Sequence, residues 1–328
     1  MFNYDVLTKT LIIQPEFNDE LVNLPNDVEI MIFNNKYPWS NFDKNVDKLP
    51  PNLTHLTFGF SFNQNVDNLP PNLTHITFGD YYNKNVDKLP PNLTHLTFGR
   101  DFNQNVDNLP KNLTHLTFGF NFYQSVDNLP KILTHLTFGD CFNQNVDKLP
   151  SKLTHLTFGY WFDQNVDKLP SNLTHLTFGF CFNQNVNNLP PNLIYLTFGV
   201  DFNQNVDKLP PNLTHLTFGW FFDKNVDNLP PNLTHLTFGK MLNQNLNNLP
   251  QSITCLKFPC NSFIKNNIPI FITKINIIFK KNDKNNEYIT NLHFMIQEIK
   301  INYKDKIHFL KKIPYGCIVK DENDNIIL

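Results

Sequence analysis

The sequence predicts a mainly β protein, a parallel β-solenoid or horseshoe built from repeats of about 20 residues, with little helix. The first observation is repetition: the stretch PNLTHLTFGFSFNQNVDNLP, which begins at Pro51, returns nearly unchanged every 20 residues until Pro250. The second is alternation, since Leu56 and Phe58 are apolar on either side of Thr57, which is the period of a half-buried strand. The third is the recurrence of a glycine and a proline at fixed places, which leaves no room for a long helix.

Each repeat contributes six apolar side chains that cannot form a core alone. In the repeat that starts at Leu53 they are Leu53, Leu56, Phe58, Phe62, Val66 and Leu69. We expect successive repeats to stack with parallel strands ~4.8 Å apart, so that these positions form one continuous core. A propeller is excluded, because each of its blades needs four strands and ~40 residues.

Glycine is confined almost entirely to one position of the repeat. Ten of the 11 glycines occupy the column from Gly59 to Gly239, and the exception is Gly316. A residue type used only there predicts a backbone that needs a positive φ or that approaches another chain segment closely.

The unit FNQNVDNLPPNLTHLTFG resembles the FNIP repeat, a relative of the leucine-rich repeats that is abundant in social amoebae and in the giant viruses that infect them. The pattern L-x-x-L-x-L is present as Leu53, Leu56 and Phe58, and the closing Leu-Pro as Leu69-Pro70. The resemblance covers residues 17–277 and implies a leucine-rich-repeat-like horseshoe with its strands on one concave face. Many members of that family carry an N-terminal F-box that recruits a ubiquitin ligase. Here Phe17 and Leu21 already fit a repeat, so we expect no F-box.

We expect four parts along the chain. These are degenerate N-terminal capping repeats at 1–45, tandem 20-residue repeats at 46–258, a degenerate final repeat at 259–279 and a C-terminal cap at 280–328. Within the cap, residues 285–300 suggest a short helix, and the chain around Asn323–Asn325 suggests a hairpin. An independent binding domain is the alternative interpretation of 280–328.

Composition narrows the classes of partner. The formal net charge of −2 gives no broad electrostatic footprint for nucleic acid. No apolar run reaches the ~18 residues of a transmembrane helix, and the N-terminus lacks the features of a signal peptide, so we expect no membrane partner and an intracellular, cytoplasmic protein. The odd count of 5 cysteines fits reduced thiols inside a cell.

Histidines fill one column of the predicted strands, with Tyr195 and Cys255 in its gaps. The column contains His55, His75, His95, His115, His135, His155, His175, His215 and His235. We expect an exposed, partly stacked ladder. A zinc site would need three or four converging ligands, whereas a straight ladder places neighbours side by side, so we expect no metal. A third hypothesis is a pH response: two cations about 5 Å apart in water repel by about 0.8 kcal/mol, so the array would loosen in mild acid.

Two further polar columns have structural interpretations. The column from Asn45 to Asn245 changes only to Ser125, which predicts side chains that hydrogen-bond loop backbone. The column from Asp47 to Asp227 is partly offset by neighbouring lysines, and we expect a solvated face rather than a calcium site.

The two positions after each glycine vary, while nearly every other column is fixed. They read Phe60-Ser61, Asp80-Tyr81, Arg100-Asp101, Phe120-Asn121, Asp140-Cys141, Tyr160-Trp161, Phe180-Cys181, Val200-Asp201, Trp220-Phe221 and Lys240-Met241. We expect them to follow the strands along one rim, and aromatic residues and arginine are enriched in binding hot spots. The alternative is neutral drift at loop positions. The candidate partner-binding residues are Phe60, Tyr81, Arg100, Phe120, Tyr160, Trp161, Phe180, Trp220 and Phe221.

The sequence therefore predicts a non-catalytic repeat scaffold that binds another protein through this rim, without a cofactor. Self-association through the same aromatic side chains is compatible with the pattern. One alternative is a substrate-recognition subunit of a ubiquitin ligase that lacks an F-box. The other is a metal-binding or pH-responsive histidine ladder.

Overall fold

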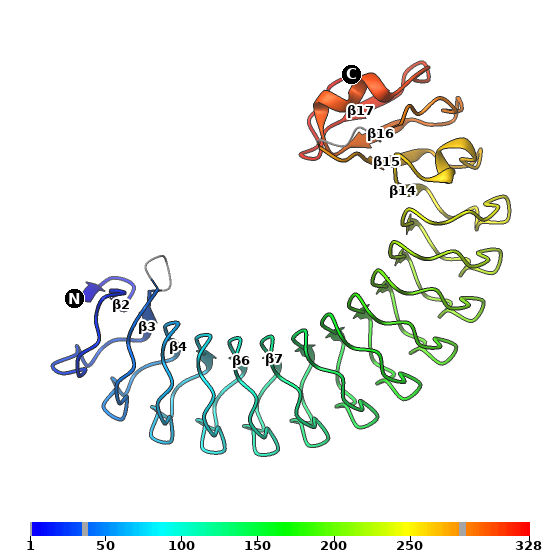
Figure 1. The fold of residues 1–328 in the computed structure, drawn as a ribbon. Coiled ribbons are helices and arrows are strands. Elements are labelled where there is room, and N and C mark those ends of the chain that lie inside the picture. The colour runs from blue at the N-terminus through cyan, green and yellow to red at the C-terminus, as the bar shows by residue number, and fades with distance from the viewer. Residues whose placement is uncertain (1, 35–38, 282–286) are drawn as a thin grey trace. The chain divides into compact units, whose positions relative to one another are not determined.

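The computed structural model describes residues 2–34, 39–281 and 287–328 (Figure 1). The chain divides into two compact units. Unit 1 comprises Met1–Gln164 with Lys168–Leu173, and unit 2 comprises Asn165–Asp167 with Thr174–Leu328.

Unit 1 is a stack of parallel strands that begins with an antiparallel hairpin. Strand β1 (Phe2–Asp5) pairs antiparallel with β2 (Thr10–Ile13), and β2 pairs in parallel with β3 (Ile30–Phe33). The parallel stack then continues, each strand paired with the one before it, through β4 (His55–Thr57), β5 (His75–Thr77), β6 (His95–Thr97), β7 (His115–Thr117), β8 (His135–Thr137) and β9 (His155–Thr157).

Unit 2 repeats this architecture. Its strands are β10 (His175–Thr177), β11 (Tyr195–Thr197), β12 (His215–Thr217), β13 (His235–Thr237), β14 (Cys255–Pro259), β15 (Lys274–Ile278), β16 (Glu298–Ile301) and β17 (Ile318–Lys320), each parallel to the next. The helices within the described residues are two short 3-10 segments, η1 (Phe263–Asn266) and η2 (Lys304–Phe309). The predicted fold class, a parallel β-solenoid with little helix, is confirmed.

The core of each unit is the stack of the six apolar columns. Phe58 and Phe62 lie in one repeat with ring centroids 3.9 Å apart, and Phe58 lies 5.3 Å from Phe78 of the next repeat. Leu53, Leu56, Phe58, Phe62, Val66 and Leu69 are all buried, as are their counterparts along the array. The register places identical residues beside one another, so the same six side chains pack in the same way in every turn.

The glycine column is explained by close approach. A Cβ atom on Gly79 would lie 1.9 Å from the carbonyl oxygen of Gly59, and one on Gly119 would lie 1.9 Å from that of Gly99. Among the described glycines only Gly316, outside the column, has a positive φ (77°). Of the two predicted reasons for glycine, a positive φ is therefore wrong and contact with the preceding backbone is correct.

The ends of the chain differ from the tandem repeats. Residues 287–300 hold no helix: His293 accepts a turn bond from Ile296, and β16 then continues the parallel stack, so the helix predicted in 285–300 is wrong over the described part. In β16, the buried Ile299 and Ile301 alternate with half-buried positions, as in a strand. The predicted C-terminal hairpin is present, with an antiparallel bridge between Lys320 and Ile326. The division at 45, 258 and 279 stays a proposal, and β16 and β17 show that the segment from 280 onward contributes strands to the same stack.

Candidate functional site

The variable rim, which we define as the two residues after each glycine of the column, has a backbone that needs no particular side chain. The amide of its second residue donates to the carbonyl of the first rim residue one repeat earlier. Examples are Tyr81 N–H to Phe60 O at 3.1 Å and Trp161 N–H to Asp140 O at 2.9 Å, and unit 2 has Phe221 N–H to Val200 O at 3.0 Å. Main-chain bonds therefore fix the turn, and the side chains are free to differ.

Large apolar side chains of the rim are exposed in both units. The exposed fraction is 50% for Tyr81, 54% for Trp161 and 46% for Phe221, and it is 40% for Phe120. Phe60, Tyr160, Phe180 and Trp220 are half-buried, and Arg100 is exposed.

Within unit 1 the rim side chains contact one another in small groups. Phe60 lies between Trp39, at 5.4 Å between ring centroids, and Tyr81, at 4.6 Å. The guanidinium carbon of Arg100 lies 5.3 Å from the ring centroid of Phe120. The rings of Tyr160 and Trp161 meet edge to face at 4.6 Å. The structure thus brings predicted anchors of unit 1 into contact with one another, Phe60 with Tyr81, Arg100 with Phe120, and Tyr160 with Trp161.

In unit 2 the rim cluster is built on Trp220. The ammonium groups of Lys240 and Lys280 lie 5.6 and 5.3 Å from its ring centroid, within the distance of a cation–π contact. Lys240 is the next rim residue along the array, whereas Lys280 follows β15.

The histidine ladder, which we define as the nine histidines of the His55 column, is a stack of parallel rings. Adjacent centroids in unit 1 are 4.1–4.2 Å apart from His55 to His155, and His215 and His235 in unit 2 are 4.3 Å apart. Tyr195 continues the stack between His175 and His215 at 4.4 Å. The structure places eight of the nine rings half-buried and His235 exposed.

A threonine before each histidine fixes the tautomer of the ring. Thr74 Oγ1 donates its one proton to Thr54 O at 3.1 Å, and the same Oγ1 lies 2.8 Å from Nδ1 of His75. Because the hydroxyl proton is already used, Nδ1 must carry a hydrogen and donate it to Oγ1. The arrangement recurs at Thr94 and Thr114. In the neutral form of such an imidazole, Nε2 is then the unprotonated nitrogen and can act as an acceptor.

Four histidines of the ladder resist protonation. Burial, followed by the charges that neighbouring histidines would carry, lowers the pKa of His75 from 6.5 to about 4. The pKa values of His95, His135 and His215 are lowered for the same reasons in the same order. Over the described residues no group of three or more His, Cys, Asp or Glu side chains could hold a metal ion.

A family model describes most of these repeats. The FNIP Repeat model matches residues 42–81, 82–121, 102–141, 120–161, 142–181, 162–201, 182–221, 202–240 and 222–261. The chain belongs to the FNIP repeat family. The resemblance inferred from the sequence is confirmed.

Two solved structures are similar to this FNIP-repeat chain. One is CroV588, a circular leucine-rich-repeat protein of a giant virus, with 32% identity and a TM-score of 0.71 over 98% of this chain and 57% of that one. The other is the functional domain of InlJ from Listeria monocytogenes, with 14% identity and a TM-score of 0.51 over 87% of this chain and 63% of that one. The FNIP-repeat chain spans less than two thirds of either protein. A comparison with curated proteins found no match. Among the described residues, no helix has the length and apolarity needed to span a membrane.

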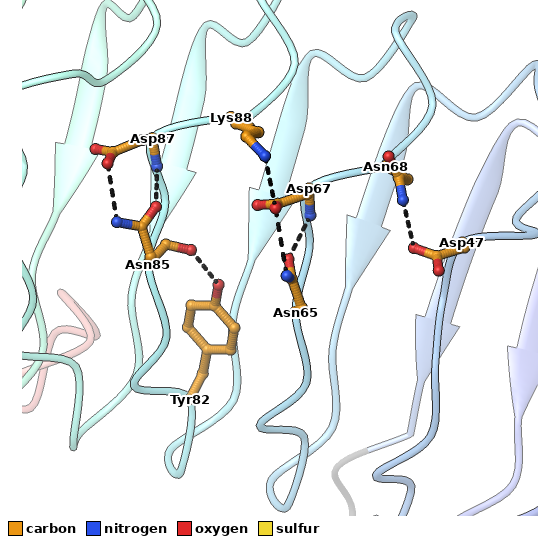
Figure 2. Close-up of polar contacts among 8 residues, drawn as sticks. All are labelled: Asp47, Asn65, Asp67, Asn68, Tyr82, Asn85, Asp87 and Lys88. Atoms are coloured by element: carbon orange, nitrogen blue, oxygen red, sulfur yellow. Dashed lines mark hydrogen bonds and ion pairs between the residues drawn. The ribbon is translucent and has the colours of Figure 1, made fainter.

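The asparagine and aspartate columns of the FNIP repeats hold the segment that returns from the rim. Asn65 Oδ1 accepts the backbone N–H of Asp67 at 2.8 Å, and Asn85 does the same for Asp87 (Figure 2). Lys88 Nζ reaches Asp67 Oδ2 of the preceding repeat at 3.0 Å. The hydrogen bond from Lys88, and then that from Asn65, lowers the pKa of the Asp67 carboxyl. The asparagine side chains thus bond loop backbone within their own repeat, as the sequence predicts, whereas Lys88 links neighbouring repeats.

Three exposed or charged side chains near the rim were missed by sequence reasoning. Trp39 lies in an insertion, so its stacking on Phe60 could not be placed from the repeat pattern. Lys280 lies beyond the tandem repeats, and its reach to Trp220 depends on the tertiary fold. Tyr123, 53% exposed, did carry a signal, because it is the single aromatic in a column of Asn and Asp.

Proposed function

We propose that this FNIP-repeat chain is a non-catalytic scaffold that binds a protein partner through the variable rim. The observation that supports it is the separation of roles within one turn: main-chain bonds hold the turn, while Tyr81, Phe120, Trp161 and Phe221 expose 40–54% of their surface. Aromatic side chains on a rigid backbone lose little conformational freedom on binding, which favours their use as anchors.

The clusters of unit 1 give the surface chemical variety. Arg100 over Phe120 offers a planar donor group, while Phe60 with Tyr81 offers apolar area. A partner that matched several clusters at once would be selected over one that matched a single cluster. Tandem repeats supply such spaced clusters without a change of backbone, which is why we favour a macromolecular partner over a small molecule.

The test is a capture experiment from amoebal lysate, read by mass spectrometry, with three baits. These are the native chain, a rim variant with Tyr81→Ser, Phe120→Ser, Trp161→Ser and Phe221→Ser, and a control variant with Tyr288→Ser, Phe294→Ser and Tyr315→Ser. The control residues are also exposed aromatics, but they lie outside the rim. All three baits should have matching circular dichroism.

A partner kept by the native chain and the control but lost by the rim variant supports the proposal. It should then bind the native chain as a purified protein and bind the rim variant at least about tenfold more weakly, because each anchor removed costs about 1–2 kcal/mol. Loss of the partner from the control variant, with retention by the rim variant, would instead place binding on the C-terminal segment.

A further inference from the structure

The charge of the rim differs between the two units. In unit 1 its acidic residues are Asp80, Asp101 and Asp140, against the single Arg100. In unit 2 the cluster on Trp220 carries the ammonium groups of Lys240 and Lys280, and the acidic rim residue is Asp201. The rim of unit 1 therefore carries a net charge of −2. The rim of unit 2 is neutral by itself, and Lys280 makes the cluster on Trp220 basic.

The units as a whole have the same asymmetry. Unit 1 carries 12 Lys or Arg and 17 Asp or Glu, a net charge of −5, whereas unit 2 carries 15 and 12, a net charge of +3. The total of −2 conceals this separation. Opposite net charges on two bodies of similar size attract a second copy in one relative orientation, unit 1 against unit 2.

The three acidic rim side chains of unit 1 are each held by a hydrogen bond to one carboxylate oxygen. Asp101 accepts from Asn121 Nδ2 at 2.9 Å, and Asp140 accepts the backbone N–H of Tyr160 at 3.1 Å. Asp80 accepts the N–H of Arg100 at 3.4 Å. Each of these bonds uses Oδ1, so Oδ2 of the same carboxylate can accept a hydrogen bond from a lysine. Because the carboxylate is already held in position, it loses little conformational freedom on binding.

The basic cluster of unit 2 combines charge with exposed apolar surface. Phe221 and Met241 beside it expose 46% and 42% of their surface. In unit 1 the corresponding apolar neighbours of the carboxylates are Tyr81 and Trp161, which expose 50% and 54%. Each side therefore offers what a stable interface needs, which is apolar area at the centre and complementary charge around it.

We propose that the partner of this rim is a second copy of the same chain. The acidic rim of unit 1 in one copy meets the Trp220 cluster of unit 2 in the other, and the same contact forms a second time by twofold symmetry. This inference rests on the proposed rim function and names its partner. Such a pairing is isologous and closes as a dimer, because both contacts form between the same two copies.

The test is the oligomeric state of charge-reversed chains, measured by sedimentation equilibrium over a wide range of concentration. One variant carries Lys240→Glu and Lys280→Glu, and the other carries Asp80→Lys and Asp101→Lys. Each should raise the dimer Kd at least about tenfold, because several rim charge pairs become repulsive and each pair contributes a few tenths to 1 kcal/mol. An equimolar mixture of the two should form heterodimers, since each variant then complements the other.

The matched control carries Lys208→Glu and Lys224→Glu, which make the same charge change in unit 2 away from the rim. Because it lowers the net charge of unit 2 equally, it should weaken the dimer only through the long-range attraction, and clearly less than Lys240→Glu with Lys280→Glu. Raising the salt concentration should weaken the native dimer, because rim charges are screened over about 8 Å at physiological ionic strength.

Three outcomes would overturn the dimer. They are a native chain that stays monomeric at about 100 µM, far above a typical standard-interface Kd, a dimer that is unchanged by both reversals, and folded variants whose mixture stays monomeric. None of these results would bear on capture of a different partner by the native rim, so the failure of this inference and that of the proposed function are distinguishable.

Discussion

At the scale of single residues, adjacent positions of one turn carry opposite constraints. Gly119 is fixed because a Cβ atom there would lie 1.9 Å from the carbonyl oxygen of Gly99. Phe120, the next residue, is 40% exposed and has counterparts as different as Asp140 and Lys240. The invariance and the variability therefore have one cause, which is the close stacking of the turn backbones.

Replacing Gly119 with alanine should destabilise unit 1 by at least about 2 kcal/mol, because backbone atoms of the preceding repeat must move. Chemical denaturation of the native and variant chains would measure the loss. Lys111→Ala, an exposed site in the same repeat, should change the free energy of unfolding by less than about 0.5 kcal/mol. Equal stability of Gly119→Ala and the native chain would show that the turns separate at little cost.

The asparagine column supports a second prediction at this scale. Asn105 Oδ1 accepts the N–H of Asp107 at 2.8 Å, and Ser125 in the next repeat accepts that of Asp127 at 3.4 Å. Asn105→Ala should cost about 1 kcal/mol and speed hydrogen exchange at the Asp107 amide, whereas Asn105→Ser should cost less. If the alanine variant exchanged no faster than the serine variant, the bond would have no role in holding the return segment.

The sequence was sufficient to predict residue roles wherever a repeat column repeats them. The burial of Leu53, Phe58 and Val66 followed from periodicity, and the role of the asparagines followed from their constancy. Periodicity could not decide between the two possible reasons for glycine, because both predict the same letter. That choice required the distance between Gly79 and Gly59.

At the scale of elements, the histidine ladder forms only because successive strands pair in register, and no single strand could form it. The 4.1–4.2 Å spacing of its rings in unit 1 follows from the in-register pairing of β4 to β9. Each ring loses water to its neighbours, and each would meet another cation if both were protonated. Burial is therefore the first cause of the lowered pKa values and repulsion the second.

This arrangement predicts a stability that falls in mild acid. His75 has a folded-state pKa of about 4 and an unfolded value of 6.5, so the unfolded chain binds its proton first. The stability contributed by the neutral ring is complete above pH 6.5 and is lost as the pH falls from 6.5 towards 4. Melting temperatures measured between pH 7.5 and 4.5 should show this decline.

A variant with His75, His95 and His135 changed to glutamine should lose less melting temperature over that range than the native chain. His308→Gln is the control, because His308 lies in η2 and outside the ladder. Parallel pH profiles for the native chain and the triple variant would contradict the prediction and assign the acid sensitivity to carboxyl groups.

Elements outside the tandem repeats were harder to predict. A degenerate final repeat was expected at 259–279, and β15 lies in it, where Ile275 and Ile277 keep the repeat's alternation. β16 was missed, because its spacing from β15 departs from the 20-residue repeat. Ile299 and Ile301 do alternate with polar residues, but the pairing with β15 depends on the tertiary fold.

At the scale of the whole molecule, a solenoid distributes its stability over contacts between neighbouring repeats. The fold class and the family could be predicted from the sequence, because every repeat carries the pattern that indicates them. The clusters on the rim could not be predicted, because the contacts of Trp39 with Phe60 and of Lys280 with Trp220 join different parts of the chain. What distinguishes this molecule from a generic array is therefore found in the positions that periodicity leaves free.

The nearest-neighbour character of the array leads to a last prediction, on the phenylalanine core. Phe122 is fully buried, 3.7 Å from Phe118 and 6.1–6.2 Å from the rings of the adjoining repeats. Phe122→Ala should cost about 3–5 kcal/mol, whereas Phe122→Leu should cost about 1 kcal/mol, because Leu242 is buried in the same column. Hydrogen exchange should quicken most at β7 and β8, which flank the cavity, and least at β4, because each repeat contacts only its neighbours. An equal loss of protection at β4 and β8 would show instead that unit 1 unfolds as a single cooperative body.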